Sequence, residues 1–577
     1  MLRRSLRSRC SIALSILALA GSSGELFAQV DLEVTSRRVP DLTPAQWVKD
    51  LRFLAARLPQ VHRNAFHSIS REDFQGEVED LERRIPELED HEVVVELARI
   101  VASIGDGHTR IWLTDYERNG FRRYPVILYD FADGLYLVVA GSEHADAVGG
   151  RVLRIGNVDV EEAMKRVDPL VHRDNAMGLR RLAPQYLRIP EVLHALGVVD
   201  DMESATYVVE KDGREIAVEV SPEPADERMD EAAFVLPPDP SAFGRADLVT
   251  MRQPGAPVPL YLRHIERTHW LEWLPETRTL YVQCNVISND DESMAEFYAR
   301  VFAATDSLPL ERLVIDLRNN GGGSNNLNSP VFLGIVRRPE IDREDRLFVI
   351  IGRTTFSAAS HLVTYLERFT HPTFVGEPTG GSPNHFGDAR PIDLPNSGVR
   401  AGASTIYWQN SLPVPFDERS WTAPGIAAQL TSRDWATGRD PALEAILAHR
   451  PEEPLTDQLV RAVAEGGLDA ALAAFDAWSA EPAHAYADVE RDLNGFGYRL
   501  LDEGRLEEAV GILAVNARAY PGSVNVWDSL GDAYQAAGHR LQAIEAYEKA
   551  AAMDPDGSLG ASAARKAGDL RNPLSEP

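Results

Sequence analysis

Residues 311–382 constrain the fold of this chain more than any other stretch. Residues 313–317 (LVIDL) form an apolar run broken by one aspartate, the pattern of a strand buried on both faces. The glycines 321–323 follow, and glycines let a backbone turn sharply and expose its amide N–H groups. A second apolar run, 347–352, leads into Ser357 and then into a helical pattern. The stretch therefore predicts an α/β layered domain with Ser357 at a strand-to-helix turn.

Ser357 is the candidate nucleophile of this stretch. A serine at a helix N-terminus presents its hydroxyl, and the N–H of the next residue, Ala358, points at any oxyanion formed beside it. The backbone amide of Gly322 or Gly323 can supply a second oxyanion donor. A serine hydroxyl is a weak nucleophile without help, so a base is also required. An aspartate in a buried strand also needs a partner, so Asp316 and Arg318 are expected to brace the glycine loop.

Residues 1–28 predict a secretory signal peptide. Four arginines precede a short apolar run at 11–20, and 26–28 (LFA) offer a small-residue cleavage site. The run is too short for a permanent membrane anchor, so we expect a periplasmic or secreted protein with no stable anchor. The mature chain keeps one cysteine, Cys284, in an apolar strand pattern, and we expect it to be a core residue.

The composition argues against several classes of partner and cofactor. A formal net charge of −29 disfavours nucleic acid and anionic membrane surfaces. The sequence has no HExxH motif and no cysteine pair, and its histidines are scattered, so no metal site is predicted. The glycines 321–323 lack the following Gly-Lys-Ser/Thr of a phosphate-binding loop, so no nucleotide cofactor is expected either.

The remaining patterns divide the chain into further parts. Residues 41–115 predict a helical subdomain, with helices from 44, at 71–87 and at 90–104. Residues 116–222 predict a β-rich subdomain that resembles a PDZ-like module, and a purely structural subdomain is the alternative. Residues 223–257 read as a linker before the α/β domain at 258–450.

The C-terminal part, residues 455–570, repeats itself. Gly497, Gly504, Ala509 and Pro521 recur 34 residues later as glycine, glycine, alanine and proline. This period resembles two all-α tetratricopeptide repeats, with a degenerate third at 464–475. Such repeats imply a surface for a protein partner.

Three segments, DLRNNGGGS, TTFSAASHL and VGEPTGGS, together resemble the tail-specific (C-terminal-processing) serine peptidase family and its tricorn-core relatives. The turn GDGHT and the later segment APGIAAQL fit the same family, and the resemblance covers roughly residues 41–450. It implies a crotonase-like catalytic domain within 258–450. It also implies hydrolysis of peptide bonds in a protein or peptide substrate, through an acyl-enzyme on Ser357.

The chain departs from the best-known branch of this family, which pairs the serine with a lysine. That lysine stands five residues after the glutamate of VGEPT, where this chain has Ser382. There is no lysine between Lys211 and Lys549. The resemblance therefore implies the tricorn-like branch, in which serine, histidine and a carboxylate act together. His108, in the GDGHT turn, matches the position of the base in that branch.

Other residues compete for the two remaining roles. His361, four residues after the serine, and His385 are the alternative bases. The resemblance places the carboxylate about sixty residues beyond the serine, which favours Asp417 narrowly over Glu418. Asp106 is a further candidate and is expected to form a turn.

These patterns predict an exported serine endopeptidase assembled across a domain boundary, with Ser357 and His108 from different parts of the chain. The alternative is a catalytically inactive peptide-binding or scaffold protein on the same fold. The missing lysine and the C-terminal repeats motivate that alternative.

Overall fold

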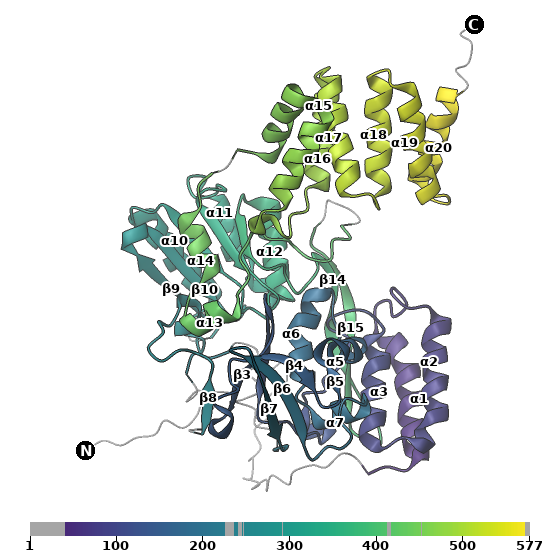
Figure 1. Ribbon diagram of the computed structural model, residues 1–577, viewed down its shortest axis with the longest axis vertical. Helices are drawn as coiled ribbons and strands as arrows, with labels where there is room; N and C mark the ends of the chain where they lie inside the picture. Colours follow the sequence, from purple (N-terminus) through teal and green to yellow (C-terminus); the bar gives the residue numbers. More distant parts are fainter. Residues whose placement is uncertain are drawn as a thin grey trace, which may run out of the picture. The chain divides into compact units, whose positions relative to one another are not determined.

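The computed structural model describes residues 41–224, 236–239, 245, 247–290, 292–411, 417–451 and 453–571. Within these ranges the protein is a mixed α/β chain with three sheets and many helices (Figure 1). The predicted signal peptide and most of the predicted linker lie outside the described residues.

Three helices open the described part of the chain, close to the predicted ranges. Thr43 and Glu89 each form a capping box with the residue three positions later, which satisfies backbone N–H groups at the helix start. The helices bury their apolar faces against one another and against later segments. They are α1 (Pro44–Val61), α2 (Arg71–Arg84) and α3 (Asp90–Ala102).

A seven-stranded sheet follows, as the β-type patterning predicts. Its strands pair in the order β2-β3-β4-β6-β7, with β5 beside β4 and β8 beside β3. The predicted hairpin joins β6 to β7, and Asp212 and Gly213 at its turn both have positive φ. The strands are β2 (Ile127–Phe131), β3 (Gly134–Gly141), β4 (Arg151–Ile155), β5 (Val158–Asp159), β6 (Ala205–Lys211), β7 (Arg214–Val220) and β8 (Leu248–Thr250). The last of these falls inside the predicted linker.

Short helices accompany this sheet. The pattern predicted α5, whereas α6 and α7 were not predicted: α6 contains Pro184, a residue that usually breaks a helix, and α7 has only 6 residues. The helices are α4 (Tyr116–Asn119), α5 (Val160–Val167), α6 (Ala176–Tyr186) and α7 (Pro190–Ala195).

The six-stranded sheet carries the stretch that constrains the fold most. Its order is β16-β13-β12-β11-β10-β9, parallel throughout except for the antiparallel pair β9 and β10. The buried runs that predicted strands are β11 (Arg312–Asp316) and β12 (Leu347–Ile351), at the centre. The others are β9 (His269–Leu274), β10 (Thr279–Cys284), β13 (Thr373–Gly376) and β16 (Ile426–Ala427).

Helices cover both faces of this sheet (Figure 1). One buried cluster joins the strands to Phe297, Val331 and Leu362 of α10, α11 and α12, and a second joins them to Ile446 of α14. This is the layered arrangement expected for parallel strands buried on both faces. The helices are α9 (Leu260–Arg263), α10 (Met294–Ser307), α11 (Ser329–Val336), α12 (Ala358–Phe369), α13 (Ser432–Thr437) and α14 (Pro441–Ala448).

A long hairpin from the α/β part, β14 (Asn384–Asp393) and β15 (Arg400–Gln409), pairs with the short strand β1 (Arg110–Ile111) of the N-terminal part. Arg110 lies opposite Gly402, and Ile111 lies opposite Ala401. One buried cluster accordingly contains residues of the N-terminal helices, of the seven-stranded sheet and of the hairpin. The two predicted subdomains at 41–115 and 116–222 thus share a single core with a segment of the α/β part.

The C-terminal residues are helical, with buried alanines at the repeated positions, Ala509 and Ala543. The helix over the predicted third repeat is interrupted at Gly466 and Gly467. The helices are α15 (Leu455–Ser479), α16 (Glu490–Asp502), α17 (Leu506–Ala519), α18 (Val524–Ala536), α19 (Arg540–Met553) and α20 (Ser558–Arg571).

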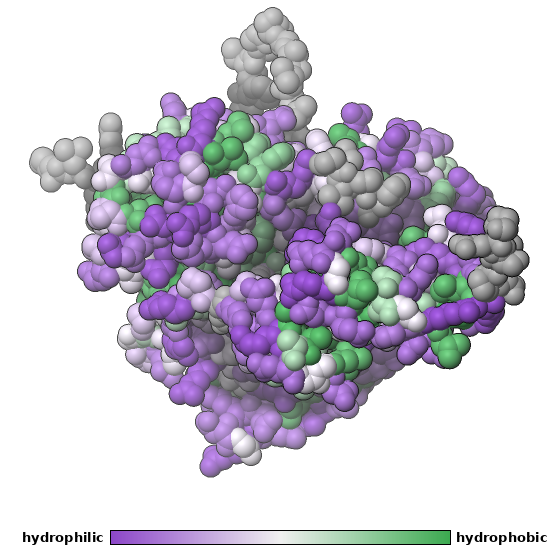
Figure 2. Space-filling view, turned by 90° about the horizontal axis from the view of Figure 1, so that it is seen from above, coloured by the Kyte–Doolittle hydropathy of each residue, from purple (hydrophilic) through white to green (hydrophobic). Residues whose placement is uncertain are grey.

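Hydrophilic residues dominate the face of the molecule that Figure 2 draws. Figure 2 shows one face, on which hydrophobic residues form small separate groups among hydrophilic ones. Among the described residues, every helix is too short or too polar to cross a bilayer.

Candidate active site

Ser357 lies between the end of β12 and the start of α12. Its backbone has φ +53° and ψ −125°, a region that residues with a side chain rarely adopt. Such a conformation costs of order 1–3 kcal/mol and persists where the surrounding fold enforces it, often at functional sites. Because β11 and β12 are parallel neighbours, the glycine loop after β11 lies beside this turn. The Phe356 N–H donates to the carbonyl of Asn320 in that loop, with 3.1 Å between the two atoms.

His108 is in hydrogen-bonding contact with the candidate nucleophile. Its Nε2 lies 3.0 Å from Ser357 Oγ, although the two residues are 249 positions apart. The imidazole is buried and stacks on the ring of Phe356, with 4.5 Å between ring centroids. The structure therefore brings together the two residues that the sequence placed in different parts of the chain.

Asp106 holds the turn that presents His108. Its Oδ1 accepts hydrogen bonds from the backbone N–H groups of His108 and Thr109 and from Ser404 Oγ on β15, at 2.8–2.9 Å. Its Oδ2 lies 2.9 Å from His62 Nε2. Burial alone would raise the pKa of Asp106, but the hydrogen bonds from His62, Thr109 and Ser404 hold that pKa well below its ordinary value. This carboxylate therefore holds the backbone of the turn. Through Ser404 it also ties the turn to β15, the strand that pairs with β1.

Replacing Asp106 by alanine is expected to lower the free energy of unfolding by about 3–5 kcal/mol, because it leaves His62 and the turn amides buried without their partner. Chemical denaturation of the full chain measures this change. Asp115→Ala is the control, since Asp115 is half-exposed and caps a single turn through the Arg118 N–H. The control should cost about 1 kcal/mol. Equal losses for the two variants would show that the turn does not depend on Asp106.

The environment of His108 keeps its imidazole neutral. Burial lowers its pKa well below the ordinary 6.5, and His385 and Arg110 lower it further, against the opposing effect of Asp106. Nδ1 of His108 is buried without a hydrogen bond to any described residue, and the nearby Phe386 carbonyl favours the protonated form. A neutral imidazole whose Nε2 faces a serine hydroxyl can accept the hydroxyl proton.

The predicted oxyanion donors differ in availability. Ala358 N–H, at the start of α12, and Gly323 N–H make no hydrogen bond within the described residues. The Gly322 N–H instead donates to Asn320 Oδ1 at 2.9 Å. A Cβ on Gly322 would lie 2.7 Å from the Cβ of Ser357 at a backbone φ of +117°. Gly322 is therefore required for close approach of the loop, and Ala358 and Gly323 have the free donors.

His385 and His361 form a stack behind His108. The ring centroids of His108 and His385 are 5.7 Å apart, and those of His385 and His361 are 4.5 Å apart. His385 Nδ1 donates to the carbonyl of Ser382 at 2.8 Å. Both ring nitrogens of His361 are buried without a partner in the described part of the chain, and burial together with His385 and His108 lowers its pKa to about 2. Of the three candidate bases, His108 is the one in contact with Ser357 Oγ.

His361→Phe is expected to reduce the loss of stability in acid. Below pH 6.5 the unfolded chain protonates this histidine, whereas the folded chain does so only near pH 2. As the pH falls from 6.5 toward 2, this histidine therefore lowers the free energy of unfolding by about 1.4 kcal/mol per pH unit. Above pH 6.5 it has no such effect. Denaturation midpoints measured at several pH values test the difference in slope. His371→Ala, which removes an exposed histidine, serves as the control. The same change of stability with pH in the wild type and in His361→Phe would contradict the expectation.

The structure does not bring the predicted carboxylates to His108. Asp417 forms an ion pair with Arg419, whose guanidinium also binds Glu367, with N···O distances of 2.7–2.9 Å. Burial alone would raise the pKa of Asp417, but Arg419 holds it below the ordinary value. Glu418 is exposed. The adjacent arginine satisfies Asp417 locally, which a count of residues from the serine does not reveal.

Asp174, which the sequence patterns did not single out, lies next to the turn instead. Its Oδ1 accepts the Gly107 N–H at 2.7 Å, and burial raises its pKa to about 6. A Cβ on Gly107 would lie 2.7 Å from the Phe356 ring and 3.1 Å from Asp174 Oδ1, so only glycine fits between them. The one sequence signal near Asp174 is Asn175, which caps α6 by accepting the Met177 N–H.

The residues expected to be structural have partners that fit this role. Asp316 on β11 binds Arg318, and Arg318 also binds Asp440 at the start of α14. Cys284 is fully buried beside Asn320, and burial raises the pKa of its thiol to about 12. Ser382, at the position of the absent lysine, donates its hydroxyl to the Ser420 carbonyl.

Comparison with known proteins gives distant structural neighbours. No family model matches the sequence, and no curated protein matches it significantly. Mature CPAF, known from a crystal structure, has 16% sequence identity to this chain. The match covers 73% of this chain and 98% of the CPAF chain, with a TM-score of 0.46. A mutant CPAF structure is 14% identical over 71% of this chain and 99% of its own, with a TM-score of 0.49. The photosystem II D1 C-terminal processing protease is 13% identical over 70% of this chain and 99% of its own, with a TM-score of 0.31.

Proposed function

We propose that the chain is a serine peptidase that cleaves peptide bonds through an acyl-enzyme on Ser357, with His108 as the base. The observation that carries this proposal is the 3.0 Å contact between His108 Nε2 and Ser357 Oγ, at a strained turn on a helix N-terminus. A serine activated by a neutral imidazole beside unused backbone N–H donors is the arrangement that acyl transfer requires.

In the proposed reaction, His108 Nε2 takes the hydroxyl proton while Ser357 Oγ attacks the substrate carbonyl carbon. The carbonyl oxygen gains the negative charge, and the N–H groups of Ala358 and Gly323 stabilise it. His108 then gives its proton to the leaving amine, which departs as the acyl-enzyme forms. Water, deprotonated in turn by His108, hydrolyses the ester and regenerates the serine.

The orienting role belongs to the turn and not to a carboxylate bound to Nδ1. Asp106 binds the backbone N–H of His108, and Phe356 stacks on the His108 ring, so both the backbone and the ring of His108 are held in place. In this proposal Asp417 stabilises its loop through Arg419 and takes no direct part in the reaction. Its removal therefore disturbs the loop and lowers the rate of peptide hydrolysis only indirectly. Export by the predicted signal peptide, and binding of a protein partner by the C-terminal helices, are parts of the same proposal.

Partitioning of the intermediate tests the mechanism. An amide and an ester with the same acyl group are incubated with the full chain and hydroxylamine. A common acyl-enzyme predicts the same ratio of hydroxamate to free acid for both substrates. Different ratios would overturn the acyl-enzyme, and a folded chain that turns over neither substrate would favour the inactive binding or scaffold protein.

A further inference from the structure

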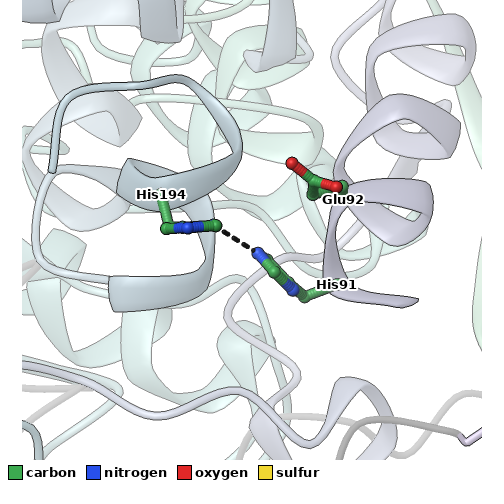
Figure 3. A group of neighbouring side chains, drawn as sticks. All are labelled: His91, Glu92 and His194. Atoms are coloured by element: carbon green, nitrogen blue, oxygen red, sulfur yellow. Dashed lines mark hydrogen bonds between the residues drawn. The ribbon is translucent and has the colours of Figure 1, made fainter. Parts of the chain in front are cut away.

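A second group of chemically versatile side chains lies away from Ser357, where α3 and α7 pack together. His91 is at the N-terminal turn of α3, and His194 is on α7. His91 Nε2 and His194 Nδ1 are 2.9 Å apart, and the planes of the two rings are tilted by 50° (Figure 3). His91 is buried and His194 is half-buried. Two imidazole nitrogens thus converge on one point inside the fold.

Glu92 completes the group from the same turn of α3. The ligand atoms of His91, Glu92 and His194 all lie within 4.8 Å of one another. Glu92 Oε2 accepts the Glu89 N–H at 2.7 Å in the capping box, so the carboxylate is held beside the histidines while its second oxygen takes no part in the cap. Figure 3 shows Glu92 on the helix next to His91, with the two histidine rings joined by their hydrogen bond.

We propose that His91 Nε2, His194 Nδ1 and the Glu92 carboxylate bind one zinc ion, with water as the fourth ligand. Two imidazoles and one carboxylate are a set of donors that zinc accepts in tetrahedral geometry, whereas magnesium and calcium prefer oxygen alone. Zinc–nitrogen bonds of about 2.0–2.1 Å at a tetrahedral angle separate two nitrogens by about 3.3 Å. The histidines therefore need to part by about half an ångström and to turn so that both nitrogen lone pairs point at the ion. The ion takes the place of the proton that they now share.

Carboxylates near the pair oppose the cost of burying a cation there. His91 Nδ1 lies 3.5 Å from Glu89 Oε2, the position of the outer carboxylate that commonly orients a metal-binding histidine. Glu191, on α7, is close enough to act electrostatically on His91, and its own carboxylate is bound to Arg122 at 2.9 Å. Carboxylates of both helices thus act electrostatically on His91.

The bound ion has a structural consequence for the active-site turn. It joins α3, which runs directly into the Gly105–His108 turn, to α7 in the region of the seven-stranded sheet. Its ligands are separate from Ser357, His108, His361 and His385. The expected role of zinc is accordingly to stabilise the N-terminal core.

Metal binding to the full chain tests the proposal directly. The chain is stripped with a chelator and titrated with Zn²⁺ against a chromophoric competitor, and Co²⁺ is used as a spectroscopic substitute. We expect one zinc per chain, a cobalt spectrum of tetrahedral type and a higher melting temperature with zinc. His194→Ala should weaken binding by more than the roughly 10- to 100-fold that loss of an outer partner costs, and Glu89→Gln should fall within that range.

Glu92→Gln is the sharpest variant, because glutamine can still form the capping box but lacks the anionic oxygen. It should keep the metal-free melting temperature and lose most of the zinc affinity. His371→Ala, which removes an exposed histidine beside Asp342, is the matched control and should bind as the wild type does. Unchanged zinc affinity in both His194→Ala and Glu92→Gln would overturn the proposal. Loss of binding only in His108→Ala or His385→Ala would do the same, by moving the ion to the active site.

Discussion

Replacing Ser357 by alanine is expected to lower kcat for peptide hydrolysis by roughly 10⁴- to 10⁶-fold. The variant removes the attacking oxygen and leaves the oxyanion donors in place. Alanine keeps the Cβ, so the strained backbone at φ +53° is unchanged and the free energy of unfolding should stay near that of the wild type. Steady-state kinetics on a peptide substrate, with denaturation of the same samples, separate the two effects.

Ser360→Ala is the matched control for this change. Ser360 lies on α12, three residues after Ser357, is buried, and donates its hydroxyl to the Thr355 carbonyl at 3.1 Å. Its loss should cost about 1 kcal/mol of stability and leave kcat within a few fold of the wild type. Substantial peptidase activity in folded Ser357→Ala would contradict the assignment of the nucleophile.

Replacing His108 by alanine is expected to lower kcat by a similar factor, because residues that act as a unit in acyl transfer lose most of the rate singly. The pH dependence of kcat/KM in the wild type should also reflect the protonation of His108. The active form is the neutral imidazole, and burial lowers its pKa below 6.5, so kcat/KM should stay level as the pH falls through 6.5 and decline only in stronger acid.

Variants of the neighbouring histidine separate the two candidate bases. His385→Ala should retain more activity than His108→Ala, since His385 stacks on the base and makes no contact with Ser357 in the described structure. An acidic limb centred at or above pH 6.5, or a larger loss in His385→Ala, would show that His108 is not the base.

Local patterns predicted those parts of the fold that local physics determines. The helix start at Thr43 follows from capping chemistry, which acts within one turn. The strands around residues 313 and 348 follow from apolar runs that suit a sheet buried on both faces. The turn at Ser357 follows from the order of strand, polar loop and helix. Each of these signals lies within a few residues of the structure that it specifies.

Long-range pairing was beyond such patterns. The hairpin of β14 and β15 reads as irregular sequence, yet its pairing with β1 fixes where the His108 turn lies. Asp174 has no motif around it and contributes through its contact with Gly107. His91 and His194 are 103 positions apart, so no ligand spacing could reveal them as a pair. The proximity of His108 to Ser357 could be expected only from the family resemblance.

Asp417 illustrates a different limit. The resemblance favoured it by its distance along the chain from the serine, but a carboxylate orients a histidine only if it is free to do so. Arg419, two residues later, binds both of its oxygens and links it to Glu367. Local charge pairing therefore explains why the structure does not bring Asp417 to His108.

Labelling by a fluorophosphonate probe tests most directly whether His108 activates Ser357. The full chain is treated with the probe, digested, and mapped by mass spectrometry, alongside Ser357→Ala, His108→Ala and His385→Ala. The predicted result is one adduct, on Ser357, that is absent in Ser357→Ala, strongly reduced in His108→Ala and retained in His385→Ala. An adduct on another serine, unchanged labelling in His108→Ala, or no labelling of the folded wild type would contradict the proposed active site.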